Sequence, residues 1–345
     1  MKRFWGVNSS VSIRWFSLSL VFWFAGGVWA QSPDPQPCRV AESERFVFYS
    51  DPWINLHHFL FQWARNEPEA VEGDRRRPVE ILEVDDLAGL SAEDREVWMS
   101  AVNFYRTELA SENLLFSDGL VGLRNRLIAG GCGDLDAAGI EPVVLKALTS
   151  TMPIYRARWW SDHDRANRAW SEEQVGLLEM HEQALAEGLA KAFGAVWPKD
   201  RVRVDVGFYA NWAGGYTTNR PDVVTLEGRS YPGLQGLEMI FHEVSHASFL
   251  EQPLKRDLAA AFEQLGEKRP GLLPHTVQFM TPAELVRSRL SEDESNGFDS
   301  VGEAVLSRGR MREQYDAVRP PWREYLAGEI EREDALERIV EALSR

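Results

Sequence analysis

The stretch Leu237-Glu-Met-Ile-Phe-His-Glu-Val-Ser-His-Ala-Ser-Phe249 decides how this chain is interpreted. It holds two histidines four residues apart, His242 and His246, and Glu243 directly follows the first. Residues four apart lie one above the other on an α-helix, so both imidazoles can reach a single metal ion. The order His-Glu-x-x-His therefore predicts a metal site built on one helix.

The residues around the motif predict the helix itself. Leu237, Phe241, Val244 and Ser248 follow the helical period and define a face that packs into a core. Pro253 is expected to end the helix, because proline has no amide hydrogen to donate and clashes with the preceding turn.

Zinc (Zn2+) is the cofactor expected from two imidazole ligands. Catalytic zinc sites hold three protein ligands, with zinc to nitrogen bonds of about 2.0–2.1 Å, and leave the fourth position for water. The metal would lower the pKa of that water and polarise a carbonyl, and Glu243 would act as the general base. Imidazole also suits copper, nickel and iron, so zinc is an expectation from ligand type.

The third ligand is expected to be His275, the one remaining histidine downstream of the motif. Glu284 is an alternative, either as a ligand or as a group that orients a ligating histidine. The segment Thr281-Pro-Ala-Glu284 also predicts a helix start, with threonine at the N-cap and proline at the first helical position. Glu263 and Glu267 form a further alternative, so the sequence leaves the third ligand open.

Over residues 202–290 the chain resembles the zincin metallopeptidases, on the motif His242-Glu-Val-Ser-His246. The resemblance implies a small sheet before the active-site helix, with an edge strand that binds extended peptide by strand addition. The metzincin class is excluded, because positions 249 and 252 hold phenylalanine and glutamine where that class has glycine and histidine.

The residues before the motif support such a sheet. Apolar residues from Val202 to Phe208 alternate with other types, the pattern of a half-buried strand. Turn residues at 213–221 lead to a second strand at Val223 to Leu226, so we expect a hairpin beside the cleft. The aromatic residues of this hairpin are expected to be packing pairs rather than catalytic groups. They are Tyr209, Trp212 and Tyr216.

The N-terminus has the features of a secretory signal peptide over residues 1–30. Basic residues precede an apolar run from Trp15 to Val28, and Ala30 offers a small-residue cleavage site. The run falls short of the roughly twenty residues that a membrane-spanning helix needs. We therefore expect a secreted or periplasmic protein with no stable membrane span after cleavage. Residues 31–43 are polar and rich in proline and are expected to form a flexible leader.

The chain is strongly acidic, with a formal net charge of −15 over 345 residues. Removal of residues 1–30 would take away basic residues and no acidic ones, which makes the charge more negative still. This balance argues against nucleic acid as a partner, because phosphate binding requires clustered lysine and arginine. The two cysteines, Cys38 and Cys132, could pair in an oxidising compartment, but the sequence leaves their pairing open.

The fold class expected is α+β, predominantly helical, with a small central sheet followed by the motif helix. Residues 44–200 are expected to form a mainly helical N-terminal lobe, and residues 201–345 the zincin-like metal-binding lobe. A short strand is predicted at 46–49, a loop at 66–78, and helices at 52–65, 91–112, 120–128, 143–149, 152–170, 172–193, 254–266, 282–290, 321–327 and 333–343.

Three further histidines could line a cleft. His57 and His58 are adjacent, so on a helix they point about 100° apart and do not easily serve one metal. We expect one of them to be packed in the core. His163 follows a double tryptophan that is itself expected to be a core or interface anchor.

Together these patterns predict a secreted zinc metallohydrolase, with a peptidase as the first interpretation. Its metal ligands would be His242, His246 and His275, with Glu243 as the catalytic base, acting on a peptide or amide substrate. One alternative is a zinc amidohydrolase that acts on cell-wall or small-molecule amides. The other is a metal-binding scaffold protein without turnover, in which Glu243 would have no catalytic role.

Overall fold

The structure is a computed structural model that describes residues 38–66, 81, 83–308 and 311–344. The predicted signal peptide and the first part of the predicted leader lie outside these residues. Within the leader, however, Arg39–Glu42 form strand β1, so that part of the segment belongs to the sheet. None of the described helices is long and apolar enough to cross a membrane.

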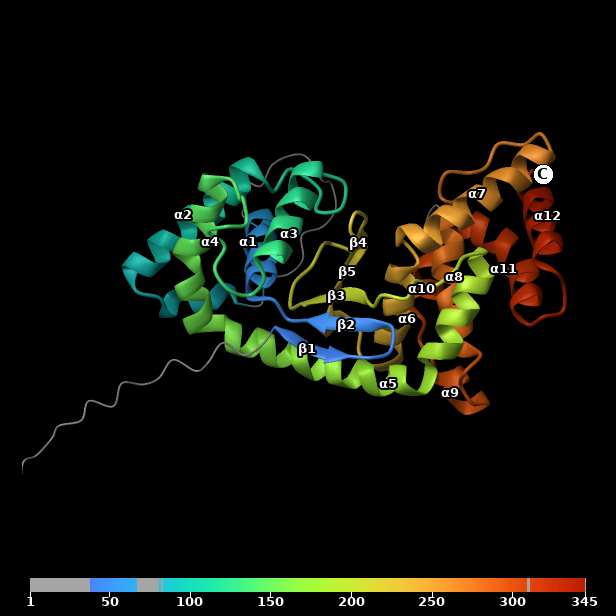
Figure 1. Cartoon of the computed structure of the whole chain (residues 1–345), viewed down its shortest axis with the longest axis horizontal. Coiled ribbons are helices and arrows are strands. Elements are labelled where there is room, and N and C mark those ends of the chain that lie inside the picture. Colours follow the sequence, from blue (N-terminus) through green and yellow to red (C-terminus); the bar gives the residue numbers. More distant parts are fainter. Residues whose placement is uncertain (1–37, 67–80, 82, 309–310, 345) are drawn as a thin grey trace, which may run out of the picture. The chain divides into compact units, whose positions relative to one another are not determined.

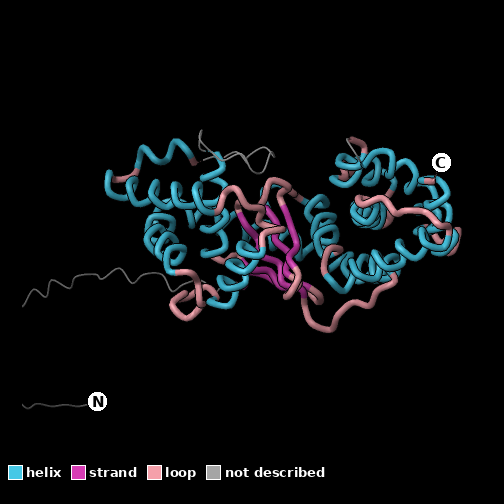
Figure 2. The backbone as a smooth tube through the Cα atoms, turned by 90° about the horizontal axis from the view of Figure 1, so that it is seen from above, coloured by secondary structure: helices cyan, strands magenta, loops and turns pink. Residues whose placement is uncertain are grey.

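The protein has an α+β fold in which helices predominate around one sheet, as predicted. The helices are α1 (Pro52–Asn66), α2 (Ala92–Glu108), α3 (Asp118–Gly130), α4 (Pro142–Tyr155), α5 (Ser161–Phe193), α6 (Gly233–Val244), α7 (Ser248–Gln264), α8 (Leu273–Arg287), α9 (Glu292–Gly297), α10 (Val301–Leu306), α11 (Arg312–Leu326) and α12 (Arg332–Leu343). Helices α1 to α4 lie on one side of the sheet and α7, α8, α11 and α12 on the other (Figure 1), and the view from above places the strands between them (Figure 2).

The sheet has five strands in the order β1-β2-β3-β5-β4. Strand β2 (Phe46–Tyr49) pairs in parallel with β3 (Val202–Gly207), which pairs in parallel with β5 (Val223–Glu227). Strand β4 (Gly215–Thr218) runs antiparallel to β5 at the edge. Parallel β2 and β3 require a long crossover, and the helices α1 to α5 provide it.

The predicted hairpin between β3 and β5 is wrong. These strands are parallel neighbours, and the hairpin partner of β5 is β4. The sequence 213–221 contains glycine, asparagine and proline, which predict a turn, but its central residues form a short strand. The pairing with β5 overrides the weak local preference, because hydrogen bonds along a sheet depend on neighbours distant in sequence.

The motif helix is shorter at its C-terminal end than predicted. Helix α6 ends at Val244, and His246 lies in the following turn. Ser245 contributes to this end, because its hydroxyl donates to the carbonyl oxygen of His242 at 2.5 Å and so competes with the helical pattern. The prediction that Pro253 ends the helix is wrong, since Pro253 lies inside the next helix, α7.

Two other predicted helix boundaries are wrong. Thr281 is not an N-cap: it lies inside α8, where its hydroxyl donates to the Val277 carbonyl oxygen at 2.7 Å. The predicted helices 152–170 and 172–193 are replaced by α4, a π-helical turn at Arg156–Trp160 and the single long helix α5. Continuous helical hydrogen bonding through residue 171 removes the break that we expected there.

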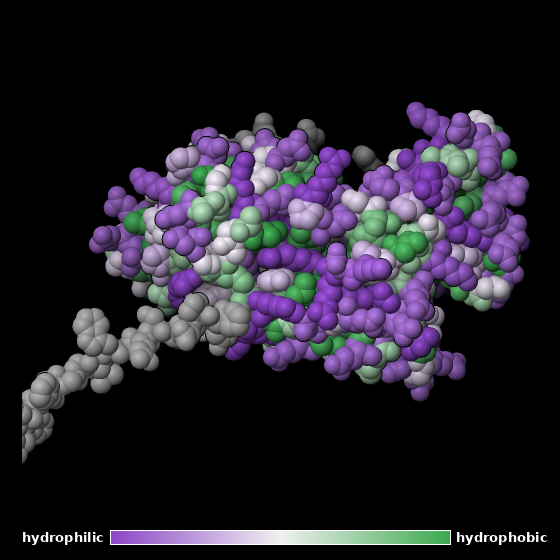
Figure 3. Space-filling view, viewed as in Figure 1, coloured by the Kyte–Doolittle hydropathy of each residue, from purple (hydrophilic) through white to green (hydrophobic). Residues whose placement is uncertain are grey.

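Two hydrophobic cores fill this compact unit. One contains side chains of α1 to α4 together with Tyr209 and Tyr216. The other contains side chains of the sheet, α5, α6 and the helices that follow. Phe46 on β2 and residues of α5 belong to the second core, although the sequence placed residues 44–200 in one lobe. The face drawn in Figure 3 is mainly hydrophilic with small hydrophobic spots, in keeping with the acidic composition.

Cys38 and Cys132 form a disulfide, with their Cα atoms 6.1 Å apart across a sequence separation of 94. The bond joins the start of β1 to the segment after α3. This settles the pairing that the sequence left open. A loop of this length constrains the unfolded chain strongly, which is how a disulfide contributes to stability in the loop-entropy view.

Candidate metal centre

Three histidines from two segments of the chain come together. His242 on α6, His246 in the turn after α6 and His275 on α8 have candidate ligand atoms that all lie within 4.8 Å of one another. Their ring centroids are 5.0 Å apart for His242 and His246, 5.1 Å for His246 and His275, and 5.6 Å for His242 and His275. Three imidazoles this close are a donor set that zinc accepts, so these residues fit the metal that the motif predicts.

His242 is the most enclosed of the three, with 2% of its surface exposed. Its Nδ1 lies 3.2 Å from the backbone carbonyl oxygen of Gln278 on α8. Since a carbonyl only accepts, Nδ1 carries the hydrogen and Nε2 keeps its lone pair for a metal. The ring of Phe279 stacks on His242 with centroids 3.7 Å apart. Burial lowers the pKa of His242 well below its ordinary value, which keeps the imidazole neutral.

His246 has a carboxylate beside it. Oε1 of Glu251, on α7, lies 3.5 Å from its Nδ1, and Oε2 of the same group lies 2.9 Å from the ammonium of Lys255. Burial alone would raise the pKa of Glu251, but its contacts with His246 and Lys255 lower it. An ionised carboxylate at Nδ1 favours the tautomer of His246 that presents Nε2.

His275 enters the group from the first turn of α8, which begins at Leu273. Its ring lies 4.7 Å from that of Phe279, one helical turn further along the same helix. Burial lowers the pKa of His275 to about 4, so this imidazole is also neutral at physiological pH and is able to bind a metal.

Glu243 is buried beside the histidines, with 5% of its surface exposed. The hydroxyl of Thr217, on edge strand β4, lies 2.7 Å from its backbone carbonyl oxygen and 3.1 Å from its Oε2. Gly215 lies two residues earlier on the same face of β4, and a Cβ there would stand 2.9 Å from Oε1 of Glu243. Burial raises the pKa of Glu243 to about 7. The carboxyl group is therefore poised to exchange a proton near neutral pH.

The alternative third ligands lie elsewhere. Glu284 forms an ion pair with Arg323 on α11. Glu263 and Glu267 line a separate surface pocket of about 510 Å³ at the end of α7. None of these carboxylates belongs to the three-histidine group, so His275 is the residue that the structure brings to the motif.

The other histidines that the sequence singled out are packed in the core. His57 pairs with the Tyr105 hydroxyl at 3.1 Å, and His58 with the Tyr216 hydroxyl at 2.8 Å. Both are fully buried, which confirms and extends the prediction that one of them is packed in the core. His163 is buried as well, with its Nε2 2.9 Å from Oε1 of Glu83.

The aromatic residues of the hairpin region divide into two kinds. Tyr209 stacks on Phe59 with ring centroids 5.3 Å apart, and Tyr216 contacts His58, so both are packing residues as predicted. Trp212, in the loop before β4, is 47% exposed, whereas Tyr209 and Tyr216 are buried.

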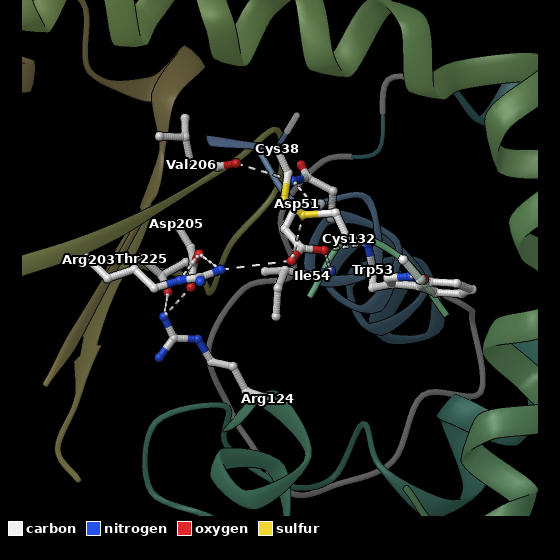
Figure 4. Close-up of polar contacts among 12 residues, drawn as sticks. Cys38, Asp51, Trp53, Ile54, Arg124, Cys132, Arg203, Asp205, Val206 and Thr225 are labelled. Atoms are coloured by element: carbon white, nitrogen blue, oxygen red, sulfur yellow. Dashed lines mark hydrogen bonds and ion pairs between the residues drawn. A yellow bond between two sulfur atoms is a disulfide. The ribbon is translucent and has the colours of Figure 1, made fainter. Parts of the chain in front are cut away.

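A second cluster of titratable groups surrounds the disulfide (Figure 4). Asp51 is 1% exposed, and its Oδ2 lies 3.6 Å from Cys132 Sγ and 3.8 Å from the guanidinium of Arg203. Arg203 also pairs with Asp205 at 2.7 Å, and Asp205 with the buried Arg124 at 3.1 Å. Burial, and then the nearby charge of Asp205, raise the pKa of Asp51 to about 7. The cysteines are oxidised to a disulfide, so this cluster is not a second thiolate metal site.

Sequence reasoning missed three residues that support the centre, namely Thr217, Glu251 and Gln278. Thr217 lay in a segment read as a turn. The contact of Gln278 with His242 is made by its backbone carbonyl oxygen, which every residue type has, so this contact leaves no signal in the sequence. Glu251 follows His246 closely, and its place five residues after this candidate ligand is the signal that could identify it.

Comparisons with known proteins add nothing to this geometry. No protein family, curated protein or solved structure matches the chain.

Proposed function

We propose that this protein is a zinc-dependent hydrolase whose metal ligands are His242, His246 and His275 and whose general base is Glu243. One observation carries the proposal: His275, distant in sequence, meets the two motif histidines next to a buried carboxylate. Short motifs arise by chance, so the third imidazole, which comes from a different helix, is the observation that is independent of the motif and supports the proposal.

Zinc, when bound, supplies a Lewis acid and lowers the pKa of a water molecule to about 7. The chain's own part begins with Glu243, whose Oε1 accepts the proton that water loses. Thr217 holds the other oxygen, Oε2, and the absent side chain of Gly215 leaves space for Oε1. The carboxyl then returns the proton to the departing amine. The same carboxyl group would thus act first as a base and then as an acid.

A peptide is the substrate class that this site supports best. Strand β4 is an edge strand, and two of its residues, Gly215 and Thr217, border the base. An edge strand next to the base is the arrangement in which zincin-like enzymes bind extended peptide. Tyr216, Thr217 and Thr218 are at most 4% exposed, so in this conformation the strand is covered, and binding of a peptide requires the covering groups to move.

A secreted or periplasmic location fits the disulfide between Cys38 and Cys132. Structural disulfides persist in oxidising compartments and are rare in the reducing cytosol. The basic and apolar residues at the N-terminus support the same location.

The test compares hydrolysis by the wild-type protein and by Glu243→Gln, loaded with zinc. A mixed peptide library and purified cell-wall polymer are supplied in parallel, so that a peptidase and a wall amidase give different products. Glu263→Gln, which changes a carboxylate outside the centre, is the matched control. We expect peptide cleavage that Glu243→Gln abolishes and the control retains. Zinc binding without cleavage of either material, or cleavage that survives Glu243→Gln, contradicts the proposal.

A further inference from the structure

The geometry points to Pro282 as a positioning residue of the metal centre. By withholding a backbone N–H inside α8, it frees the carbonyl oxygen of Gln278 to hold the imidazole of His242 in the tautomer that binds metal. The role in metal binding rests on the proposed function. The contact between His242 and the Gln278 carbonyl oxygen, and the tautomer of His242 that follows from it, are tested separately.

Helix α8 runs from Leu273 to Arg287, and Pro282 lies in its interior. In an α-helix the carbonyl oxygen of residue 278 accepts from the N–H of residue 282. Proline has no N–H, and its ring also pushes away the carbonyl four residues earlier. The oxygen of Gln278 thus has no N–H partner at residue 282 and remains available as an acceptor for another group.

His242 uses this oxygen. Its Nδ1 lies 3.2 Å from it, and the imidazole is almost completely shielded from solvent. A buried ring nitrogen that bears hydrogen needs an acceptor, and a carbonyl already satisfied by a helical N–H is a poorer one. The proton is therefore fixed on Nδ1, which leaves Nε2 unprotonated and free to bind metal.

The same part of α8 fixes the rest of the motif. The side-chain amide of Gln278 donates to the carbonyl oxygen of Ser245 at 2.9 Å, in the turn that carries His246. Phe279 stacks on His242 and restricts rotation of its ring. The segment of α8 from His275 to Pro282, about two turns long, thus supplies one proposed ligand, an acceptor for the second and a support for the third.

Helix propensity alone would disfavour proline at this position. Pro153 also lies inside a helix, α4, and is exposed. Because of Pro153, the carbonyl oxygen of Thr149 lacks its usual helical N–H partner. Thr149 lies on α4, whose side chains pack in the core formed by α1 to α4, away from the three histidines. Pro153 is therefore a matched control for the general effect of removing a helix proline.

The first experiment tests the contact in the wild-type protein and needs no substitution in α8. The histidines are labelled with 15N, and the protein is freed of metal at pH 8, where a neutral imidazole shows its tautomer by NMR. A His242→Gln variant assigns the signal. We expect His242 with hydrogen on Nδ1 and a free Nε2. Hydrogen on Nε2 in the wild-type protein overturns the inference.

The second experiment measures zinc affinity by competition with a chelator for wild type, Pro282→Ala and Pro153→Ala. The alanine N–H at position 282 is expected to compete for the Gln278 carbonyl, so affinity falls about 10–100-fold, the usual effect of losing a group that orients a ligand. Pro153→Ala is expected to bind zinc as wild type does. Circular dichroism confirms that each variant is folded.

The two proposals fail in different ways. If wild type binds no zinc, the proposed function fails, while the tautomer measurement still tests the role of the carbonyl. If wild type binds zinc and a folded Pro282→Ala binds it equally well, only the role of Pro282 is overturned. If both helix prolines lower the affinity alike, the effect is general and the inference is again overturned.

Discussion

The hydroxyl of Thr217 lies 2.7 Å from the backbone carbonyl oxygen of Glu243 and 3.1 Å from Oε2 of the same residue. The edge strand β4 thereby contacts Glu243, the proposed base, both at its backbone and at its carboxyl group. On the opposite face of β4, Tyr216 contacts His58, and Thr218 accepts from the buried Arg124. Strand β4 is therefore held on both faces, and the helical part of the chain that carries His58 and Arg124 contributes to the position of Glu243.

Replacement of Thr217 tests this contact. Thr217→Val keeps the shape and removes the hydroxyl, and the loss of a hydrogen bond to a carboxylate costs about 1.5–3 kcal/mol. We expect kcat on a cleaved peptide to fall roughly 10–100-fold, with zinc content unchanged. Thr217→Ser should retain most of the activity. Equal rates for the valine variant and wild type would show that the hydroxyl does not position the base.

Gly215 tests the space beside the carboxyl group. A Cβ at this position would stand 2.9 Å both from Oε1 of Glu243 and from Cδ2 of Leu226. We expect Gly215→Ala to lower stability by about 1–3 kcal/mol, as overpacking does, and to reduce kcat by displacing Glu243. Gly176→Ala, on α5 with no atom within 4 Å of its new Cβ, is the control and should be neutral or stabilising in urea denaturation. Full activity of Gly215→Ala would contradict the prediction.

Asp51 gives a prediction for pH. Its carboxyl ionises near 3.8 in an ordinary environment and near 7 in the folded protein, because burial disfavours the charged form. Between these pH values the folded state binds more protons than the unfolded state, so this group makes stability fall as pH rises. An asparagine side chain at position 51 does not titrate. Its oxygen can still accept from the backbone N–H of Trp53, as Asp51 Oδ1 does at 2.9 Å, and so cap the start of α1.

We therefore expect Asp51→Asn to gain stability relative to wild type between pH 4 and pH 8, by up to about 4 kcal/mol. Urea denaturation at the two pH values measures this difference. If the free energies of unfolding of the variant and the wild type differ by the same amount at pH 4 and at pH 8, Asp51 does not titrate in this range and the prediction is wrong.

The disulfide gives a prediction for stability. Replacing Cys38 and Cys132 together by serine opens a loop of 94 residues, and the loop-entropy view assigns about 4–5 kcal/mol to its closure. We expect a lower denaturation midpoint for the double variant, and the same change when wild type is treated with a thiol reductant. A double variant as stable as oxidised wild type would show that the bond contributes little.

The sequence allowed the three histidines of the candidate centre to be singled out, because the chemistry of a metal site depends on residue type. His275 was chosen as the last histidine downstream of the motif, and α8 brings it to the other two. Glu284 was a reasonable alternative by type, but its partner is Arg323, distant in sequence, and no local pattern reveals that pair.

The errors in the predicted fold have a common physical origin. The sequence predicts helix boundaries at Pro253 and Pro282, yet both prolines lie inside helices whose tertiary packing outweighs the lost hydrogen bond. Strand β4 is short and rich in residues typical of turns, and only its pairing with β5 makes it a strand. These features depend on long-range contacts, so propensity alone does not predict them.

The most direct measurement is the zinc content of the purified protein by elemental analysis, for wild type, His275→Ala and His181→Ala. His181 lies on α5 outside the three-histidine group and controls for the loss of an imidazole. We predict close to one zinc per chain in wild type and in His181→Ala, and its loss in His275→Ala. A folded wild-type protein that holds no metal and takes up none when zinc is added would contradict the proposed centre.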